Sequence, residues 1–376
     1  MKYKNARAKV FTFSNGTEVS EAHVVIHVTD TALAYQEQLE AVNAVITHLR
    51  GNELKGYDVV FKRYYLSDAA NQADELYAAI IEDDNCAMSV IQQPPLNGTK
   101  IALWAYLMTG MQPVDSGNGL HAVKHGEFTH LWNGSANNLA ANSEYQTQLL
   151  LNEYVAQLAK EGCTLASNCI RTWFFVNDID LNYGGVVRAR NQVFFTQGLI
   201  NETHFIASTG IGGRQANQNV LVQMDNYAIA GIRPEQICHL YAPAYLNRTS
   251  DYGVSFERGT CVDYADRRHV FISGTASIDN KGCIVHPKNV VKQTARMIEN
   301  VEALLSEAGC TTRDIGQISV YLRDIADYVI VNRIFAERFP DIPYVIVQAP
   351  VCRPGWLIEM ECMAVKQQDN PALPSF

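Results

Sequence analysis

The chain has 376 residues, a net charge of −9 and 47% hydrophobic residues, as is usual for a globular protein with sizeable cores. Its length fits two to three domains of roughly 100–200 residues each. Lys and Arg do not cluster along the sequence, although a nucleic-acid partner requires a basic face. The apolar runs all fall well short of the ~18 residues of a membrane helix. We therefore expect a small-molecule ligand, no nucleic acid and no membrane.

Nine cysteines are scattered along the chain without a CxxC pair, and several lie in apolar runs. This usage favours free, buried thiols in a reducing compartment over disulfides or zinc. The histidines lack metal-ligand spacings such as HExxH. The first seven residues are charged and no apolar stretch follows them, so we expect no secretory signal. The sequence predicts a cytoplasmic protein without a metal or another cofactor.

The first hundred residues predict a small α+β module within residues 1–112. Helices are expected at 31–49 and 70–81, and strands at 59–66, 86–92 and 99–107. The segment Tyr64-Tyr-Leu-Ser-Asp68 parallels Val320-Tyr-Leu-Arg-Asp324 position by position. A linker rich in Gly, Pro, Asp, Ser and Asn is expected near 110–126.

A second module is predicted within residues 120–230. It has a strand at 130–137, a helix at 143–161, a strand at 170–176, a helix at 183–198 and two strands around the glycines of 210–213. The segment Ser208-Thr-Gly-Ile-Gly-Gly213 lacks the spacing of a phosphate-binding loop and precedes a strand, so a tight hairpin is favoured. A second linker is expected at 231–260.

The third module, within residues 255–368, has the clearest pattern. A strand at 269–278 runs into a glycine turn within Ser273–Ser277, and a hairpin leads towards 283–285. Apolar residues at spacings of three and four predict a helix from 288 that Gly309 ends. The remaining elements are a strand at 315–322, a helix at 325–338, and strands at 344–348 and 356–365.

The order ββαβαββ therefore occurs three times in one chain, which predicts an α+β fold. A repeat of this length exceeds solenoid periods, so the copies are whole domains. A sheet with two helices on one face leaves its other face bare, and three such faces could close a barrel-like core. The poor alternation of residues 169–176 is consistent with a strand that is buried on both faces.

The third module resembles the RidA/YjgF (endoribonuclease L-PSP-like) superfamily. The resemblance rests on Ser273-Gly-Thr275, Gln293, Asn300, Tyr321-Leu-Arg-Asp324, Asn332 and Glu359-Met-Glu361. Family members are homotrimers with a chorismate mutase-like fold and sites in the clefts between subunits. The resemblance implies that the three modules form this trimer internally. Covalent linkage then gives the modules a high effective concentration relative to one another and removes the entropy cost of subunit association. The chain would then be a monomeric pseudo-trimer, with further oligomerisation open.

Residues 165–366 are also similar to the chorismatases, which are hydrolases of chorismate built from RidA-like modules. Matching segments are Arg171-Thr-Trp173, Asn177-Asp-Ile179, Arg188-Ala-Arg190-Asn191, Ser208–Gly212, Pro234-x-Gln236, Tyr252-Gly-x-Ser255-Phe256-x-Arg258, Ser273–Ile278, and Val351-Cys352-Arg353 leading to Glu359. The resemblance implies release of pyruvate from chorismate or a related enolpyruvyl or cyclic carboxylate.

Glu359 is the candidate catalytic residue. Glu359 and Glu361 are two apart on a predicted strand and should point to the same face. Partial shielding from water would raise the pKa of a carboxyl group and let it donate a proton at neutral pH. The resemblance implies that Glu359 protonates the methylene carbon of the enolpyruvyl ether. Two strand glutamates that face solvent or pair with Arg353 would be the structural alternative.

Chorismate carries two carboxylates, so its site requires fixed positive charge, ideally from bidentate arginine. Each arginine of a matched motif could instead form an ordinary ion pair between modules. Tyrosines could supply hydroxyls and ring faces for the cyclohexadiene, and Thr275 a hydrogen-bond donor. The candidate substrate-binding residues are Arg171, Tyr241, Tyr252, Arg258, Thr275, Tyr344, Cys352, Arg353 and Glu361.

Two other functions remain open. In RidA proteins that act as enamine/imine deaminases, an arginine fifteen residues before the strand glutamate clamps the substrate carboxylate. Here that position is Tyr344, and the aligned positions near His204 and Ala87 also lack arginine. The chain could alternatively be a non-catalytic pseudo-trimer that binds a small ligand. The exact substrate, the product subtype and the role of the first module are not fixed by the sequence.

Overall fold

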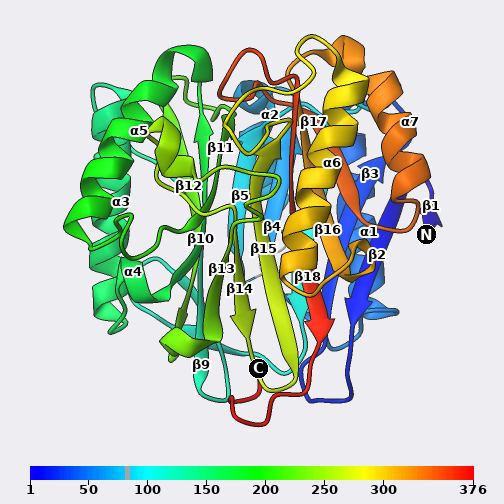
Figure 1. The fold of residues 1–376 in the computed structure, drawn as a ribbon. Coiled ribbons are helices and arrows are strands. Elements are labelled where there is room, and N and C mark those ends of the chain that lie inside the picture. The colour runs from blue at the N-terminus through cyan, green and yellow to red at the C-terminus, as the bar shows by residue number, and fades with distance from the viewer. Residues whose placement is uncertain (81–84) are drawn as a thin grey trace.

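The computed structural model describes residues 1–80 and 85–376, apart from the side chain of Tyr252. In this part of the chain the strands form three six-stranded sheets of the same topology. Figure 1 shows the strands in the centre and the helices at the periphery. The protein is thus an α+β intramolecular pseudo-trimer of three tandem modules, as the repeat predicts.

The first module has the strand order β1-β2-β3-β6-β4-β5. Its strands are β1 (Lys2–Tyr3), β2 (Ala6–Phe13), β3 (Glu21–Val28), β4 (Asp58–Leu66), β5 (Ala87–Gln92) and β6 (Ile101–Met108), and its helices are α1 (Tyr35–Gly51) and α2 (Ala69–Ala78). The expected second helix included Ile81, which lies outside the described residues. Strands β4 and β5 are parallel, because helix α2 carries the chain back between them.

The second module repeats this order as β7-β8-β9-β12-β10-β11. Its strands are β7 (Gln112–Asp115), β8 (His121–His125), β9 (Phe128–Ala136), β10 (Cys169–Val176), β11 (Ala207–Gly212) and β12 (Val222–Ala230), and its helices are α3 (Ser143–Lys160), α4 (Leu165–Asn168) and α5 (Ile179–Thr196). All eight residues of β10 are buried, as its poor alternation predicts.

The third module has the order β13-β14-β15-β18-β16-β17. Its strands are β13 (Ile237–Leu240), β14 (Gly259–Asp263), β15 (Arg267–Ala276), β16 (Ile315–Leu322), β17 (Tyr344–Gln348) and β18 (Ile358–Gln367). Its α-helices are α6 (Val290–Glu307) and α7 (Tyr328–Arg338). Four short 3-10 helices complete it, namely η1 (Pro234–Gln236), η2 (Thr249–Tyr252), η3 (Thr312–Asp314) and η4 (Ile325–Asp327). Asn289 caps α6 by accepting a hydrogen bond from the Lys292 amide, and Gly309 follows the helix at φ +69°, where glycine is favoured.

Three expectations about turns and linkers are wrong. The expected linkers contain strands β7, β8 and β13, and β14 begins at Gly259. Ser208–Gly212 lies within β11, which pairs with β10 rather than forming a hairpin with β12. The Ser273–Ser277 turn is instead mostly strand β15, with an irregular register between Ile272 and Thr275. The hairpin towards 283–285 is present in short form, because Ile278 and Ile284 form an antiparallel bridge and the Val285 amide donates to the Ser277 carbonyl at 3.0 Å. Turn-forming residues here serve close packing, which local sequence does not reveal.

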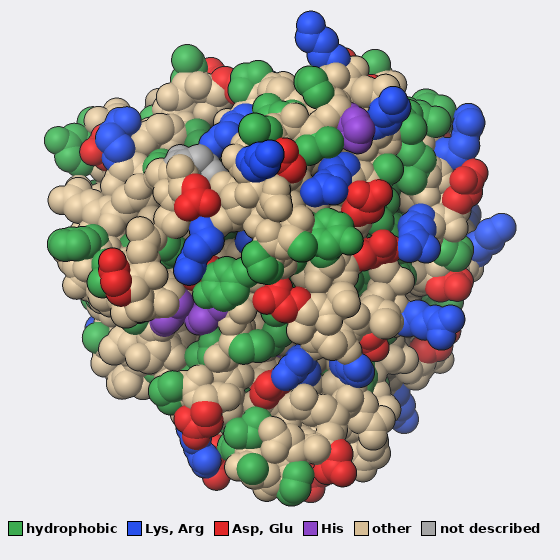
Figure 2. All heavy atoms as spheres, viewed as in Figure 1, with side chains coloured by type: hydrophobic (Ala, Val, Ile, Leu, Met, Phe, Trp, Pro, Cys, Tyr) green, Lys and Arg blue, Asp and Glu red, His purple; other side chains and the backbone are tan. Residues whose placement is uncertain are grey.

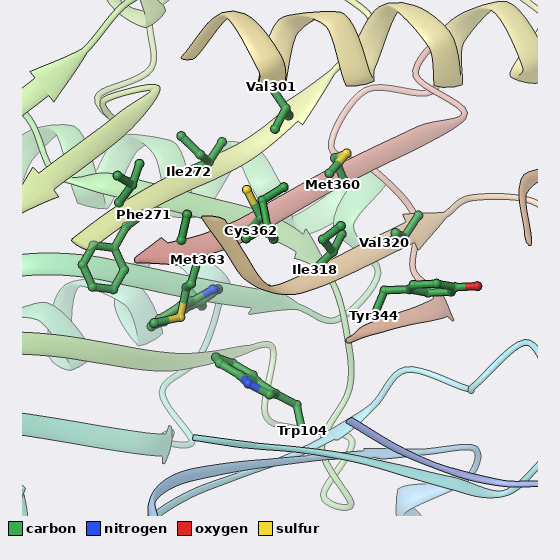
Figure 3. Packing of buried hydrophobic residues seen from close by; sticks show 14 of the residues in the cluster. Trp104, Phe271, Ile272, Val301, Ile318, Val320, Tyr344, Met360, Cys362 and Met363 are labelled. Carbon is green, nitrogen blue, oxygen red and sulfur yellow. The ribbon is translucent and has the colours of Figure 1, made fainter. Parts of the chain in front are cut away.

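The bare faces of the three sheets meet in a shared core. The first module contributes the fully buried Trp104, and the second module contributes Trp132 and Trp173. The ring of Phe61 lies 5.2 Å from that of Trp132 and 6.3 Å from that of Trp173. In Figure 3, Phe271 and Met363 lie on the side of their sheet that faces Trp104, and Val301 points from α6 towards the other side. Side-chain alternation along each strand thus separates the shared core from the core beneath the helices.

A buried ion-pair network joins all three modules near this core. Glu361 Oε2 lies 2.7 Å from Arg171 Nη2, and Glu361 Oε1 lies 3.7 Å from Arg63 Nη1. Arg63 also pairs with Asp225 at 2.9 Å. Glu361 Oε1 accepts hydrogen bonds from Trp173 Nε1 and Tyr321 Oη, both at 2.9 Å. The expected pairing of strand glutamates with Arg353 is therefore replaced, for Glu361, by Arg171 of the second module.

The described helices include none that is long and apolar enough to cross a membrane. On the face shown in Figure 2, Lys and Arg side chains are interspersed with Asp and Glu.

Candidate active site

A cavity of about 270 Å³ lies between the second and third modules. Helix α5 and strand β11 form one wall, while β15, β18 and the loops before β14 and β18 form the other. The lining residues are Tyr183, Gly184, Val187, Arg190, Ser208, Gly210, Val254, Phe256, Arg258, Gly274, Ala276, Ile278, Cys352, Arg353, Trp356 and Glu359. The cavity thus occupies an intermodular cleft, the kind of place in which the family resemblance predicts the site.

Glu359 points into this cavity from β18, where it lies opposite Ala276 of β15 and Tyr321 of β16. A Cβ atom on Gly274 would collide with the Glu359 carboxyl. Glycine at the irregular position in β15 therefore makes room for the acid. The glycines around this site are explained by close packing, because a Cβ atom on Gly210 would likewise meet the ring of Tyr183 at 2.7 Å.

The environment of Glu359 favours its protonated form. The residue is 5% exposed, and burial raises the pKa of its carboxyl from 4.5 to about 8, helped by the neighbouring Glu361 and opposed by Arg171 and Arg258. Burial dominates because a carboxylate loses its hydration in a low-dielectric site. At neutral pH the cavity therefore holds a neutral acid that can donate a proton.

Three arginines from separate segments surround the same space. Arg258 is buried and donates from Nε and Nη2 to the Asn247 carbonyl at 3.2 and 3.1 Å. The Arg353 guanidinium lies 5.0 Å from the centre of the Trp356 ring. Arg190 extends from α5 between Phe174 and Phe256, whose ring centres are 6.0 and 5.9 Å from its guanidinium. The cavity can therefore present positive charge to a ligand with more than one carboxylate.

Two buried side chains at the cavity retain hydrogen-bonding capacity. Within residues 1–80 and 85–376, Arg190 Nε and Nη2 and Trp356 Nε1 have no hydrogen-bond acceptor. Arg190 is 1% exposed, and an unsatisfied buried cation is costly. An acceptor-rich ligand in the cavity would satisfy these donors.

The remaining candidate residues divide into two groups. Arg258, Cys352 and Arg353 line the cavity with Glu359. Arg171 and Glu361 lie behind its wall, where both bond to Thr209. Thr275 is buried and donates to the carbonyl of Ser273 at 2.9 Å.

The three candidate tyrosines are distributed differently from the expectation. The ring centre of Tyr241 lies 4.8 Å from the Arg248 guanidinium. Tyr241 is not among the residues that line the cavity. Tyr344 packs under Lys9 of the first module, with its ring centre 4.4 Å from Lys9 Nζ, and so faces the first module instead of the cavity. The side chain of Tyr252 lies outside the described part of the structure.

Sequence reasoning did not select Tyr183, Arg190, Phe256 and Trp356, although all four line the cavity. Arg190 and Phe256 do lie in the segments that carry the chorismatase resemblance. A helical pattern puts Arg190 on the buried side of α5 next to Val186 and Val193, and a buried arginine without an obvious partner is the available signal.

Comparisons with known proteins agree with this architecture. The family model described as endoribonuclease L-PSP matches residues 261–366. A RutC family protein of Pyrococcus abyssi is 34% identical over 100 residues, which is 26% of this chain and 79% of that protein. The 3-aminoacrylate deaminase RutC of Acinetobacter baylyi is 33% identical over 97 residues, or 25% of this chain and 77% of that protein.

Among solved structures, a chorismatase superposes with a TM-score of 0.64 at 19% identity, covering 82% of this chain and 93% of that chain. At this identity the likeness shows a shared fold that extends over most of the chain. The chain belongs to the RutC family, within the RidA/YjgF superfamily, and has a chorismatase-like fold.

Proposed function

We propose that this protein is a chorismatase-like hydrolase that releases pyruvate from chorismate or a related enolpyruvyl carboxylate. The single observation that supports it most is the neutral Glu359 carboxyl in a cavity ringed by Arg190, Arg258 and Arg353. Enol ether hydrolysis requires an acid that is protonated near neutral pH, and a dianionic substrate requires fixed cations.

In the proposed reaction, Glu359 donates its proton to the methylene carbon of the enolpyruvyl ether. The ether carbon becomes an oxocarbenium centre, and water adds to it to give a hemiketal. Breakage of the remaining bond to the ring oxygen yields pyruvate and a ring alcohol. The water supplies one proton to the Glu359 carboxylate and another to the ring oxygen, so the acid is regenerated.

The walls of the cavity suit the ring of such a substrate. Val187, Val254 and Ile278 provide apolar surface, and the aromatic rings of Phe256 and Trp356 flank the arginines. Apolar walls with a few placed polar groups are typical of small-molecule sites. They also exclude bulk water, which keeps Glu359 protonated.

The direct test is the release of pyruvate from chorismate by the purified protein, with a protein-free control for spontaneous breakdown. Pyruvate together with a dihydroxycyclohexadiene acid or a hydroxybenzoate would support the proposal and identify the subtype. Folded protein that binds chorismate without forming pyruvate would overturn the hydrolase and leave a binding role.

Arg190→Met should weaken binding of chorismate by roughly 10- to 100-fold, the value of one or two hydrogen bonds to a charged group. Stability should not fall, because the protein gives Arg190 Nε and Nη2 no acceptor among the described residues, and the variant removes a costly buried cation. Arg188→Met is the matched control on the same helix, since Arg188 is 65% exposed and pairs with Glu144 on the surface. Titration calorimetry measures both affinities, and equal affinities for the two variants would contradict this role.

Turnover should fall as the pH rises through about 8. Above that pH, Glu359 becomes a carboxylate and can no longer donate a proton, whereas below it the acid stays protonated. The measurement is kcat/KM for pyruvate release between pH 6 and pH 10 at constant ionic strength. A profile that stays flat across this alkaline range would argue against Glu359 as the proton donor.

An enamine or imine deaminase is the second candidate, favoured by the 33% identical deaminase of Acinetobacter baylyi. Strand register places Ser208 and Met88 at the positions equivalent to Tyr344, so the equivalent residue in the second module is Ser208 rather than His204. Since these positions lack the carboxylate-clamping arginine of RidA deaminases, we favour the hydrolase. Ammonia release from an enamine substrate, without pyruvate from chorismate, would reverse this preference.

A further inference from the structure

Two cysteines face each other across the edge of the third sheet. Cys238 of β13 is directly opposite Cys261 of β14 in the antiparallel register. Opposed residues in such a pair have Cα atoms roughly 4.5 or 5.5 Å apart, and a disulfide requires about 4.4–6.8 Å. The backbone is therefore already placed for a bond between the two sulfurs.

The two thiols are in contact and differ in character. They share a hydrogen bond, which together with the nearby Arg268 guanidinium lowers the pKa of Cys238 and, with burial, raises the pKa of Cys261. Cys238 is half-buried on an edge strand, whereas Cys261 is fully buried. Cys238 is thus the accessible, more acidic sulfur of the pair, and such a sulfur is the better nucleophile near neutral pH.

Three other thiols, of the buried Cys169 and Cys310 and the half-buried Cys352, have a different environment. Burial raises the pKa of Cys310 to about 11 and those of Cys169 and Cys352 to about 12, which makes them poor nucleophiles. Cys283 is exposed and serves as an internal comparison for simple accessibility.

We propose that Cys238 and Cys261 are a redox modification site, which hydrogen peroxide converts from a dithiol to a disulfide. The Cys238 thiolate attacks one peroxide oxygen, the O–O bond breaks, and a sulfenic acid forms while the departing hydroxide becomes water. The Cys261 sulfur then attacks the Cys238 sulfur, the S–O bond breaks, and the hydroxide leaves as water with the Cys261 proton. Overall, two thiols and one peroxide give one disulfide and two waters.

This bond would act on the candidate active site through the intervening chain. Residues 241–258 connect β13 to β14 and bring Val254, Phe256 and Arg258 to the cavity. A disulfide between Cys238 and Cys261 would join the two ends of this segment covalently. The closed loop has fewer open conformations, so oxidation should restrain this wall of the cavity.

The test treats the full-length protein with hydrogen peroxide, blocks residual thiols with N-ethylmaleimide and digests with trypsin. Cleavage after Arg248 and Arg258 places the cysteines on separate peptides, 215–248 and 259–267. We expect these two peptides to be joined in most molecules, and a reductant should separate them. Joined peptides should persist in Cys283→Ser. Free Cys238 and Cys261 in protein whose Cys283 is fully oxidised would overturn the proposal.

The assignment of the nucleophile is tested with single variants. Cys261→Ser should accumulate a sulfenic acid at Cys238 that dimedone labels, whereas Cys238→Ser should leave Cys261 unlabelled. Labelling of Cys261 in Cys238→Ser at the rate of Cys238 in Cys261→Ser would reverse the assignment.

Oxidation should also slow tryptic cleavage at Arg248 in the native protein. Equal cleavage of oxidised and reduced protein would refute the restraint on the segment.

Discussion

Replacing Glu359 by Gln should leave the protein folded and able to bind chorismate, while turnover falls by roughly 10²- to 10⁴-fold, the contribution of a general acid. Gln has nearly the same shape as the protonated carboxyl that the buried site favours, so binding should be retained. Glu299→Gln is a suitable control, because Glu299 is 57% exposed on α6. Steady-state rates of pyruvate release and chorismate binding would be measured for both variants, and undiminished turnover in E359Q would end the proposed mechanism.

The same variant has an expected effect on stability. The pKa of Glu359 rises from 4.5 to about 8 on folding, so between these values the native state keeps a proton that the unfolded state releases. The contribution of the Glu359 carboxyl to the free energy of unfolding of the wild type is therefore fully present below about pH 4.5. This contribution is lost as the pH rises towards 8. Glu359→Gln should remove this loss, so its stability relative to wild type should increase across that pH window. Urea denaturation at several pH values measures this difference.

Glu361→Ala should destabilise the protein by about 3–5 kcal/mol, because it leaves a buried charge without its partner. The variant removes the carboxylate that pairs with Arg171 at 2.7 Å and accepts hydrogen bonds from Trp173 and Tyr321. The Glu361 side chain is 4% exposed and that of Arg171 is 2% exposed, so water cannot replace the lost partner. The cost also spreads across modules, since Arg63 of the first module lies 3.7 Å away.

Arg338→Ala provides the matched control for this prediction. Arg338 pairs with Glu302, but the two side chains are 53% and 33% exposed, and such surface pairs contribute about 0–1 kcal/mol. The free energy of unfolding, from urea denaturation, should therefore separate the two variants by at least ~2 kcal/mol. If both variants lost the same free energy of unfolding, the buried network would not be what holds the modules together.

The buried network also bears on why one chain carries three modules. Arg63, Arg171 and Glu361 belong to the first, second and third modules respectively. In this network each module contributes a different side chain, an arrangement that three identical subunits could not supply. Fusion into one chain therefore permits an asymmetric centre, with Glu359 in the cleft between the second and third modules.

Much of the architecture follows from local sequence. The apolar period of α6 and the glycines that follow α3 and α6 determine where these helices lie, because helix faces and C-terminal stops are set by neighbouring residues. The repeated element order then determines the fold class. The spacing of Glu359 and Glu361 likewise places both on one face of β18, since alternation is a local property of a strand.

The composition of the cavity is a property of the tertiary structure. Arg190 and Trp356 are far apart in sequence, and their shared cavity depends on how the second module packs against the third. For the same reason, Arg171 and Glu361 face the central network, and Tyr344 faces the first module. The glycines at 210 and 274 resemble turn residues in sequence, yet the structure uses them inside strands, where neighbouring side chains need the space. Sequence periodicity specifies which face of a helix or strand a residue occupies. The residues of other modules that contact this face are determined only by how the modules pack.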